Sequence, residues 1–208
     1  MSKGDVSFGA IETTLKRAAA ALKEAGVPFM LGGSLAVFAR GGPESCSDLD
    51  LIVKPEDAER ALGVLLELGM RREDPPEDWL VKAWDGDVLV DLIFAPLGLR
   101  VDDELIESGE PMNVLSIHMP VMSLEDVFMT KLMSMNDHYM DYPGLLKLVR
   151  AVREQVDWDN VRTRADSPYA RAFFSLLDEL DVVAADSPAA GTEGGRPTIR
   201  ALTRPSRA

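Results

Sequence analysis

Three aspartates stand inside segments that otherwise have the apolar composition of buried strands. Asp48 and Asp50 lie in "SCSDLDLIV", and Asp91 lies in the middle of "VLVDLIF". Aspartate is among the poorest strand formers, and buried carboxylates lose hydration and repel one another. A divalent cation would compensate such charges, because Mg²⁺ prefers carboxylate oxygens as ligands. The three aspartates therefore indicate a metal site.

The alternation of side chains along a strand places Asp48 and Asp50 on one face and the leucines between and beside them on the other. A neighbouring strand that carries Asp91 would bring all three carboxylates together, and together they could hold two cations for in-line phosphoryl transfer. Each aspartate alone has a structural alternative: Asp48 could cap a turn, and Asp91 could pair with a buried arginine. The combination favours the metal site.

A glycine-rich turn precedes the aspartates. In "FMLGGSLAVF", Gly32 and Gly33 interrupt an apolar strand, and Ser34 is expected to cap a short helix over 35–40. Free backbone N–H groups and a hydroxyl in such a turn can bind an anion. The same residues could form an ordinary turn, so the turn indicates an anion site only in combination with the aspartates that follow it.

The elements that must position these residues alternate between helix and strand. Apolar spacing and turn residues predict a polar loop over 72–78 and a hairpin around Asp85-Gly86. The predicted helices cover 8–25, 35–40, 55–69, 123–135, 144–156 and 167–180, and the predicted strands cover 27–31, 48–53, 79–84, 88–94, 112–117 and 119–122. Ser123 with Asp126 forms a capping-box-like helix start. This order predicts an α/β fold, a mixed sheet flanked by helices, with a helical C-terminal half.

The same pattern predicts a domain of residues 1–122, a helical region of 123–184 and a basic tail of 185–208. The tail carries Arg196, Arg200, Arg204 and Arg207. Its Gly, Pro, Ser and Thr content predicts disorder, with a nucleic-acid or partner-binding arm as the alternative.

Composition narrows the class of protein. The chain has 208 residues, is 46% hydrophobic and carries a formal net charge of −13, which disfavours indiscriminate binding to nucleic acid. A single cysteine, Cys46, excludes an internal disulfide framework. We find no apolar run near the roughly 18 residues of a membrane helix and no apolar signal-peptide core. These features predict a soluble cytoplasmic protein without membrane partners.

The stretch "GGSLAVFARGGPESCSDLDLIV", followed by "VDLIF", resembles the nucleotidyltransferase superfamily that includes DNA polymerase beta. The resemblance covers about residues 10–95. It implies that Gly33 and Ser34 grip the triphosphate of an NTP and that Asp48, Asp50 and Asp91 hold two Mg²⁺ ions. It further implies that Asp91 faces the acceptor hydroxyl, and that the chain is an enzyme of EC 2.7.7 type that transfers a nucleoside monophosphate.

A second stretch, "SLEDVFMTKL", is similar to a helix of minimal bacterial nucleotidyltransferases, including the AbiEii/MenT type toxins. This resemblance implies that Lys131 contacts the nucleotide phosphates and that an acidic residue follows, with Asp141 better placed than Asp137. Arg40, at the end of the helix after the turn, could help to neutralise phosphate or could be a plain helix-end cation.

The sequence is compatible with three interpretations of the acceptor and the function. The first interpretation is a toxin that uses an NTP such as ATP to modify tRNA and is opposed by a cognate antitoxin. The second is a small-molecule transferase of the antibiotic-modifying kind. The long loop between Ser34 and Asp48 resembles the corresponding loop of such enzymes. The third, from another class, is a non-catalytic nucleotide-binding module of the same fold.

Overall fold

The computed structural model describes residues 6–44 and 48–183. The strands are β1 (Phe29–Leu31), β2 (Leu49–Val53), β3 (Arg71–Glu73), β4 (Leu80–Asp85), β5 (Val88–Ile93), β6 (Glu110–Val114) and β7 (Ile117–Val121). The α-helices are α1 (Phe8–Glu24), α2 (Gly33–Phe38), α3 (Ala58–Glu67), α4 (Asp103–Glu107), α5 (Leu124–Met133), α6 (Tyr142–Val152), α7 (Trp158–Arg164) and α8 (Pro168–Glu179). Short 3-10 turns cover Pro55–Asp57 and Arg153–Gln155. The predictions for Cys46 and for the tail of 185–208 concern positions outside the described residues.

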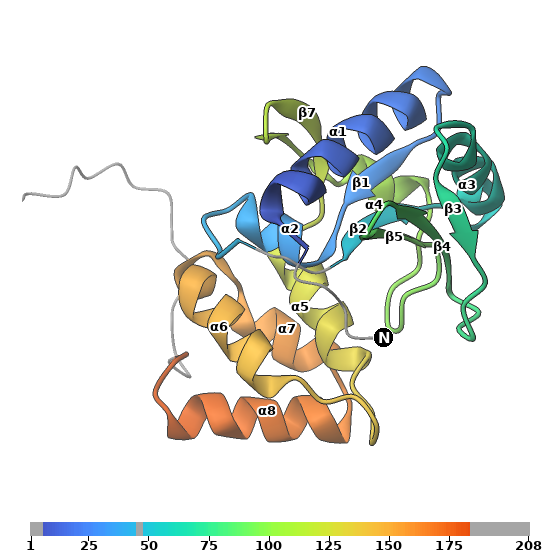
Figure 1. The fold of residues 1–208 in the computed structure, drawn as a ribbon. Helices are drawn as coiled ribbons and strands as arrows, with labels where there is room; N and C mark the ends of the chain where they lie inside the picture. The colour runs from blue at the N-terminus through green and yellow to red at the C-terminus, as the bar shows by residue number, and fades with distance from the viewer. Residues whose placement is uncertain (1–5, 45–47, 184–208) are drawn as a thin grey trace, which may run out of the picture.

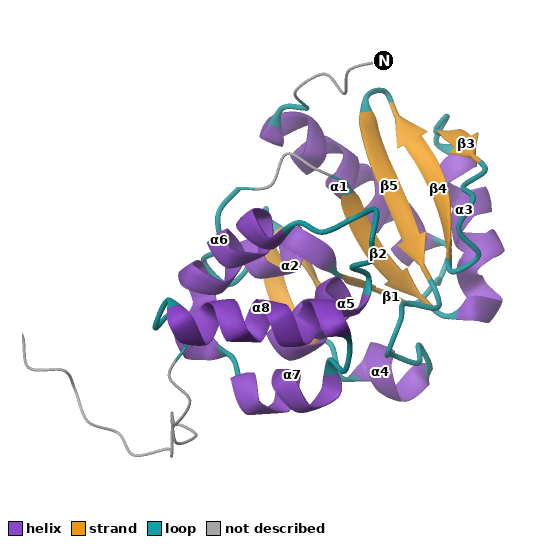
Figure 2. Cartoon of the chain, turned by 90° about the horizontal axis from the view of Figure 1, so that it is seen from below, coloured by secondary structure: helices purple, strands orange, loops and turns teal. Residues whose placement is uncertain are grey.

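The strands form one mixed sheet in the order β3-β4-β5-β2-β1-β7-β6 (Figures 1 and 2). β2 lies at its centre, antiparallel to β1 and parallel to β5. The two segments that carry the unusual aspartates are therefore neighbours, although a helix and the β3–β4 ribbon separate them in the chain. The mixed α/β fold predicted from the sequence is confirmed.

Helices α1 and α3 cover one face of this sheet. They contact each other, α3 packs on β4 and β5, and α1 contacts β5 and β7. Within β2, Leu49, Leu51 and Val53 are all 0% exposed. Because neighbouring side chains point to opposite faces, Asp50 and Ile52 belong to the other face, which is left open for the remaining elements.

The helices that follow the last strand gather beside one end of the sheet, as both ribbon views show (Figures 1 and 2). Aromatic contacts join these helices. The ring centroids of Phe128 of α5 and Trp158 of α7 are 4.9 Å apart, and those of Tyr142 of α6 and Phe173 of α8 are 5.2 Å apart. α2 contacts both α5 and α6, so the helical part packs directly on the turn after β1. The division into separate domains at residue 122 stays a prediction.

Three elements were not predicted: β3, α4 and α7. β3 consists of polar residues and is recognised only through its pairing with β4, so its own letters resemble a loop. α4 is a five-residue helix in which Ile106 is the buried residue, too short for a visible period. The predicted cap by Ser34 is wrong, because α2 begins at Gly33, two residues earlier than predicted, and has Gly32 at its N-cap.

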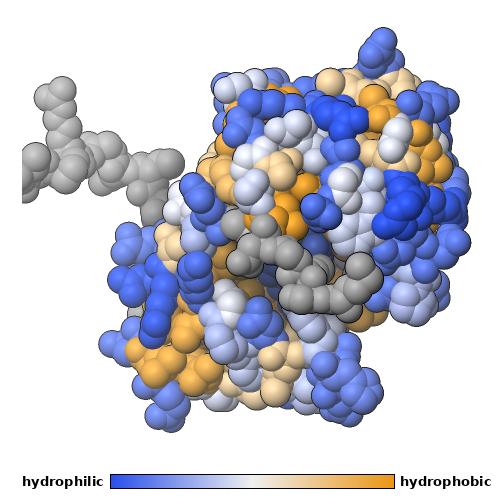
Figure 3. Space-filling model, viewed as in Figure 1, coloured by the Kyte–Doolittle hydropathy of each residue, from blue (hydrophilic) through white to orange (hydrophobic). Residues whose placement is uncertain are grey.

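The described part of the chain includes no helix long and apolar enough to cross a membrane. The face shown in Figure 3 is mostly polar, with scattered apolar patches.

A partly buried hydrogen bond joins α1 to the β4–β5 hairpin and allows a stability prediction. Thr14 is 2% exposed, and its Oγ1 donates to Asp85 Oδ2 at 2.9 Å. Thr14→Val preserves the side-chain shape but removes this donor, so the free energy of unfolding is expected to fall by about 1 kcal/mol in urea denaturation. Thr13→Val is the matched control, because the exposed Thr13 hydroxyl donates to Gly9 O of its own helix. Equal losses in both variants would contradict this assignment.

Candidate functional site

The turn after β1 lies directly against the aspartate strand. The Gly32 N–H donates to the Asp50 carbonyl oxygen at 2.9 Å, and Gly33 has a φ of 57°. A Cβ added to Gly33 would lie 1.7 Å from Asp50 Oδ2. Glycine is therefore required at position 33 both for the left-handed backbone and for this approach. The turn places Ser34 beside the carboxylates.

Asp50 and Asp91 are direct register partners on the parallel strands β2 and β5. Side chains of such partners project from the same face of a sheet. Asp91 is 8% exposed, which is unusual for a carboxylate. The two segments that carry these aspartates are thus neighbours in the sheet, with Asp50 and Asp91 in register.

Charges crowd around Asp50. Burial raises the pKa of the Asp50 carboxyl above its usual range; the nearby Lys131 charge opposes this, the Asp48 carboxylate adds to it, and Lys82 opposes it. Loss of solvation and a neighbouring negative charge both disfavour the ionised form. The site therefore concentrates negative charge that a bound cation would stabilise.

A cavity of about 460 Å³ opens in front of this strand. Its polar lining comprises Ser34, Glu44, Asp48, Asp50, Lys131, Ser134, Tyr139, Asp141 and Lys147, and its other lining residues are Pro43, Met135, Gly144, Leu145 and Leu148. The cavity thus joins the turn and β2 to the C-terminal end of α5 and to α6. It brings together Ser34, Asp48, Asp50, Lys131 and Asp141 from the sequence-based set, whereas Asp91 stands beside Asp50 and outside the lining.

The residues of this site can be compared with the ligands that a divalent cation requires. Among residues 6–44 and 48–183, the structure gathers no group of three or more His, Cys, Asp or Glu side chains close enough to hold a metal ion. The donor chemistry nonetheless fits Mg²⁺: Asp50 and Asp91 are register partners on the adjacent strands β2 and β5, and Asp48 lines the same cavity as Asp50. All three supply the carboxylate oxygens that this ion prefers.

Arg40 is placed away from these groups. Its Nη2 pairs with Glu110 Oε2 at 3.0 Å, its Nη1 donates to Ala36 O at 3.1 Å, and it lines a different cavity of about 360 Å³. The sequence-based interpretation of Arg40 as a phosphate ligand therefore gains no support, because β6 supplies a carboxylate that occupies the guanidinium.

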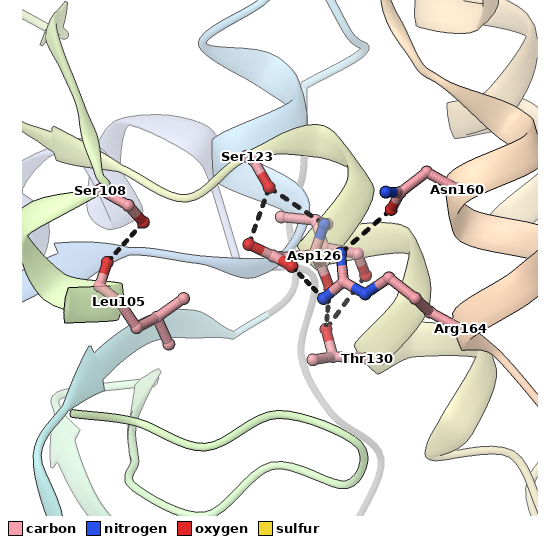
Figure 4. Close-up of polar contacts among 8 residues, drawn as sticks. Leu105, Ser108, Ser123, Asp126, Thr130, Asn160 and Arg164 are labelled. Carbon is pink, nitrogen blue, oxygen red and sulfur yellow. Dashed lines mark hydrogen bonds and ion pairs between the residues drawn. The ribbon is translucent and has the colours of Figure 1, made fainter.

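Helix α5 contributes Lys131 to the cavity lining. Polar contacts anchor the N-terminus of this helix (Figure 4). Ser123 Oγ accepts from the Asp126 N–H at 3.1 Å and donates to Asp126 Oδ2 at 2.8 Å, as the capping pattern predicts. Arg164 of α7 adds an ion pair with Asp126 Oδ1 at 2.5 Å. This second anchor was not predicted, because it depends on how α7 packs.

Lys147 and Asp141 enter the cavity from α6. Asp141 is the N-cap of that helix and accepts from the Gly144 N–H at 2.9 Å. Lys147 was missed by sequence reasoning: a lysine next to the buried Leu148 has the pattern of an ordinary solvated helix face. It becomes a cavity residue only because α6 packs near α2.

Solved structures of other proteins are similar to this chain in fold. The solution structure of the antibiotic-resistance factor ANT(2'')-Ia is similar with a TM-score of 0.60 at 19% identity, covering 84% of this chain and 97% of that one. The crystal structure of ANT(2'')-Ia in complex with adenylyl-2''-tobramycin has a TM-score of 0.58 at 19% identity, covering 80% and 98%. These two likenesses show a shared fold.

The lincomycin-bound lincosamide antibiotic adenylyltransferase LnuA has a TM-score of 0.48 at 14% identity, covering 70% of this chain and 98% of that one. Curated proteins give no significant match. A family model described as an uncharacterised nucleotidyltransferase matches residues 10–179. The matched range includes the Gly33–Ser34 turn, all three aspartates and the helices that complete the cavity. The chain therefore belongs to this nucleotidyltransferase family.

Proposed function

We propose that the protein is a Mg²⁺-dependent nucleotidyltransferase that moves a nucleoside monophosphate from an NTP to an acceptor hydroxyl and releases pyrophosphate. The observation that supports this most directly is the pairing of Asp50 with Asp91 next to the Gly33–Ser34 turn. Family membership supports the reaction class, while the metal, the NTP and the acceptor belong to the proposal.

Asp48, Asp50 and Asp91 would hold the metal ions. Two bound Mg²⁺ ions would supply charge stabilisation at the phosphate and activation of the attacking oxygen. Gly33 and Ser34 would bind the triphosphate through backbone N–H groups and the hydroxyl, and Lys131, which lines the same cavity, would neutralise its charge. Asp91 would orient the acceptor hydroxyl and take up its proton. Placement and charge stabilisation suffice for phosphoryl transfer, so no side-chain nucleophile is required.

The nucleoside would lie against the α5–α6 wall. Met135, Leu145 and Leu148 give this wall an apolar surface, which suits a base and a ribose. Tyr139, 57% exposed, stands at the same wall. ATP is our first choice of NTP because the fold neighbour ANT(2'')-Ia is described with an adenylyl product.

A small molecule is the acceptor that we propose ahead of tRNA. The cavity lining carries Glu44, Asp48, Asp50 and Asp141 against Lys131 and Lys147, and the chain has a net charge of −13. Such a surface repels a polyanion. ANT(2'')-Ia is described as an antibiotic-resistance factor and in complex with adenylyl-2''-tobramycin. Toxin action on tRNA, with an antitoxin partner, stays a prediction for the same assay.

The assay incubates the full chain and Mg²⁺ with each labelled NTP and, separately, bulk tRNA, aminoglycosides and lincosamides. Label on a small molecule is the expected result, and label on tRNA would favour the toxin interpretation. If no acceptor is labelled, calorimetry with each NTP separates the remaining cases: binding without transfer indicates a nucleotide-binding module, and no binding contradicts the proposal.

Lys131→Met tests the phosphate-binding role of α5. The variant is expected to raise the Kd for the NTP by about tenfold to a hundredfold, since a hydrogen bond to a charged group contributes roughly 1.5–3 kcal/mol. Lys131→Arg should restore part of the binding. Lys16→Met is the control for loss of one positive charge, because Lys16 lies on α1 in an exposed pair with Glu12. An unchanged Kd, measured by calorimetry, would remove Lys131 from the site.

A further inference from the structure

Lys82 stands in the same row as the two paired carboxylates. β4 runs antiparallel to β5, and Lys82 is the register partner of Asp91, which is itself the partner of Asp50. Residues directly opposite each other on adjacent strands share a face. A row Lys82–Asp91–Asp50 therefore crosses three neighbouring strands on the face that carries the candidate site.

The surroundings of Lys82 show which groups its charge can reach. Its side chain is 16% exposed, and its Nζ lies 4.0 Å from Glu77 Oε2, at the outer limit of an ion pair. Lys82 is thus a largely buried cation that lies one strand from Asp91 and two strands from Asp50.

Two lysines flank the carboxylates from different elements. Lys131 comes from α5 and lines the cavity, whereas Lys82 comes from β4 and is not part of that lining. Of these two lysines, Lys131 is therefore the one placed to meet the nucleotide that we assign to this cavity. Lys82 faces the same negative charges from the strand beside Asp91, the carboxylate assigned to the acceptor hydroxyl.

We propose that Lys82 is a positioning residue that stabilises Asp91 and Asp50 in the metal-free enzyme and competes with the divalent cation for these carboxylates. The inference rests on the metal-dependent function proposed above. A fixed positive charge beside two acidic ligands offsets their mutual repulsion, but it also repels an arriving cation. Its removal should therefore have two opposite effects: lower stability without metal and tighter binding of metal.

The alternative is that Lys82 belongs only to a surface ion pair with Glu77. A surface pair of that kind contributes little to stability, and its loss would leave metal affinity unchanged. The positioning role and the plain surface pair therefore predict different changes in metal affinity when Lys82 is replaced. Metal affinity can be measured without enzymatic turnover.

The experiment compares the full chain with Lys82→Met, which keeps the aliphatic stem and removes the charge, and with Lys82→Arg, which keeps the charge. Calorimetry with Mn²⁺ alone at neutral pH measures metal affinity. Lys82→Met is expected to bind Mn²⁺ about tenfold more tightly, the scale of a screened charge interaction near a protein surface. Lys82→Arg and the surface control Lys16→Met should keep wild-type affinity.

Thermal unfolding supplies a second readout on the same proteins. In EDTA, Lys82→Met is expected to have a lower Tm than the wild type, and saturating Mn²⁺ should close or reverse this gap. Glu77→Gln provides an independent variant, should Lys82→Met not fold: removal of the competing carboxylate leaves Lys82 with Asp91 and Asp50, so Mn²⁺ should bind several-fold more weakly.

Unchanged or weaker Mn²⁺ binding by folded Lys82→Met, or unchanged binding by Glu77→Gln, would overturn the role of Lys82 while leaving the proposed function in place. Failure of the wild type itself to bind Mn²⁺ would overturn the metal-dependent function, and the role of Lys82 with it.

Discussion

Asp50→Asn is expected to abolish nucleotidyl transfer and at the same time to make the metal-free protein more stable. The activity should fall about a thousandfold or more, as when a preorganised electrostatic group is lost from an active site. The free energy of unfolding should rise by about 1 kcal/mol, a common gain when a strained functional residue is replaced. The reason is that burial and the nearby Asp48 both disfavour the Asp50 carboxylate.

The pH dependence of this gain has a definite sign. Burial raises the pKa of Asp50 in the folded protein, so the folded state holds this proton more strongly than the unfolded chain. The stability that the proton provides is complete below the ordinary pKa of an aspartate and is lost as pH rises through the raised value. The advantage of Asp50→Asn should therefore be greatest at neutral pH and shrink as pH falls through the raised pKa.

Urea denaturation in EDTA at several pH values measures this difference. Asp166→Asn is the matched control, because the Asp166 side chain is 83% exposed in its pair with Arg171 and its replacement should change stability little. Retained transfer by Asp50→Asn, or a stability difference that does not vary with pH, would contradict the assignment of Asp50.

Gly33→Ala is expected to eliminate NTP binding at the turn and to lower stability. The new Cβ would lie 1.7 Å from Asp50 Oδ2 and 2.5 Å from its Cγ, far inside any van der Waals contact. Either the carboxylate moves or the turn opens, and both separate the phosphate-binding groups from the metal ligands. We expect at least about a hundredfold loss of activity, as for misplaced catalytic groups, and an additional backbone cost of about 1 kcal/mol.

Gly86→Ala is a close control for the backbone effect. Gly86 has a φ of 61°, against 57° for Gly33, but a Cβ there would meet no atom within 4 Å. Both variants pay for the left-handed conformation, and only Gly33→Ala collides with Asp50. Calorimetry with NTP should show loss of binding in Gly33→Ala alone, and urea denaturation should show a larger loss of stability in Gly33→Ala than in Gly86→Ala. Equal NTP binding and equal stability in the two variants would mean that the close approach of Gly33 to Asp50 is unimportant.

Much of the fold follows from local sequence. The alternation in "DLDLIV" predicts β2, the almost wholly apolar run "VLVDLIF" predicts β5, and the turn signal at Asp85-Gly86 predicts the β4–β5 hairpin. The cap of α5 by Ser123 was also recognised, since a capping bond spans three residues. β3 was missed for the opposite reason, because its residues are polar and only the neighbouring strand makes them a strand.

The sequence by itself determined the chemical inventory: which carboxylates stand in apolar strands, where the glycine turn lies, and which class of reaction such a set suits. Only the tertiary structure decided which groups meet. It placed Asp50 in register with Asp91, paired Arg40 with Glu110 in an ion pair, and brought Lys131 and Lys147 into the lining of one cavity. The physical reason is range: alternation, turns and caps act over a few residues, whereas strand order and helix packing depend on burial across the whole core.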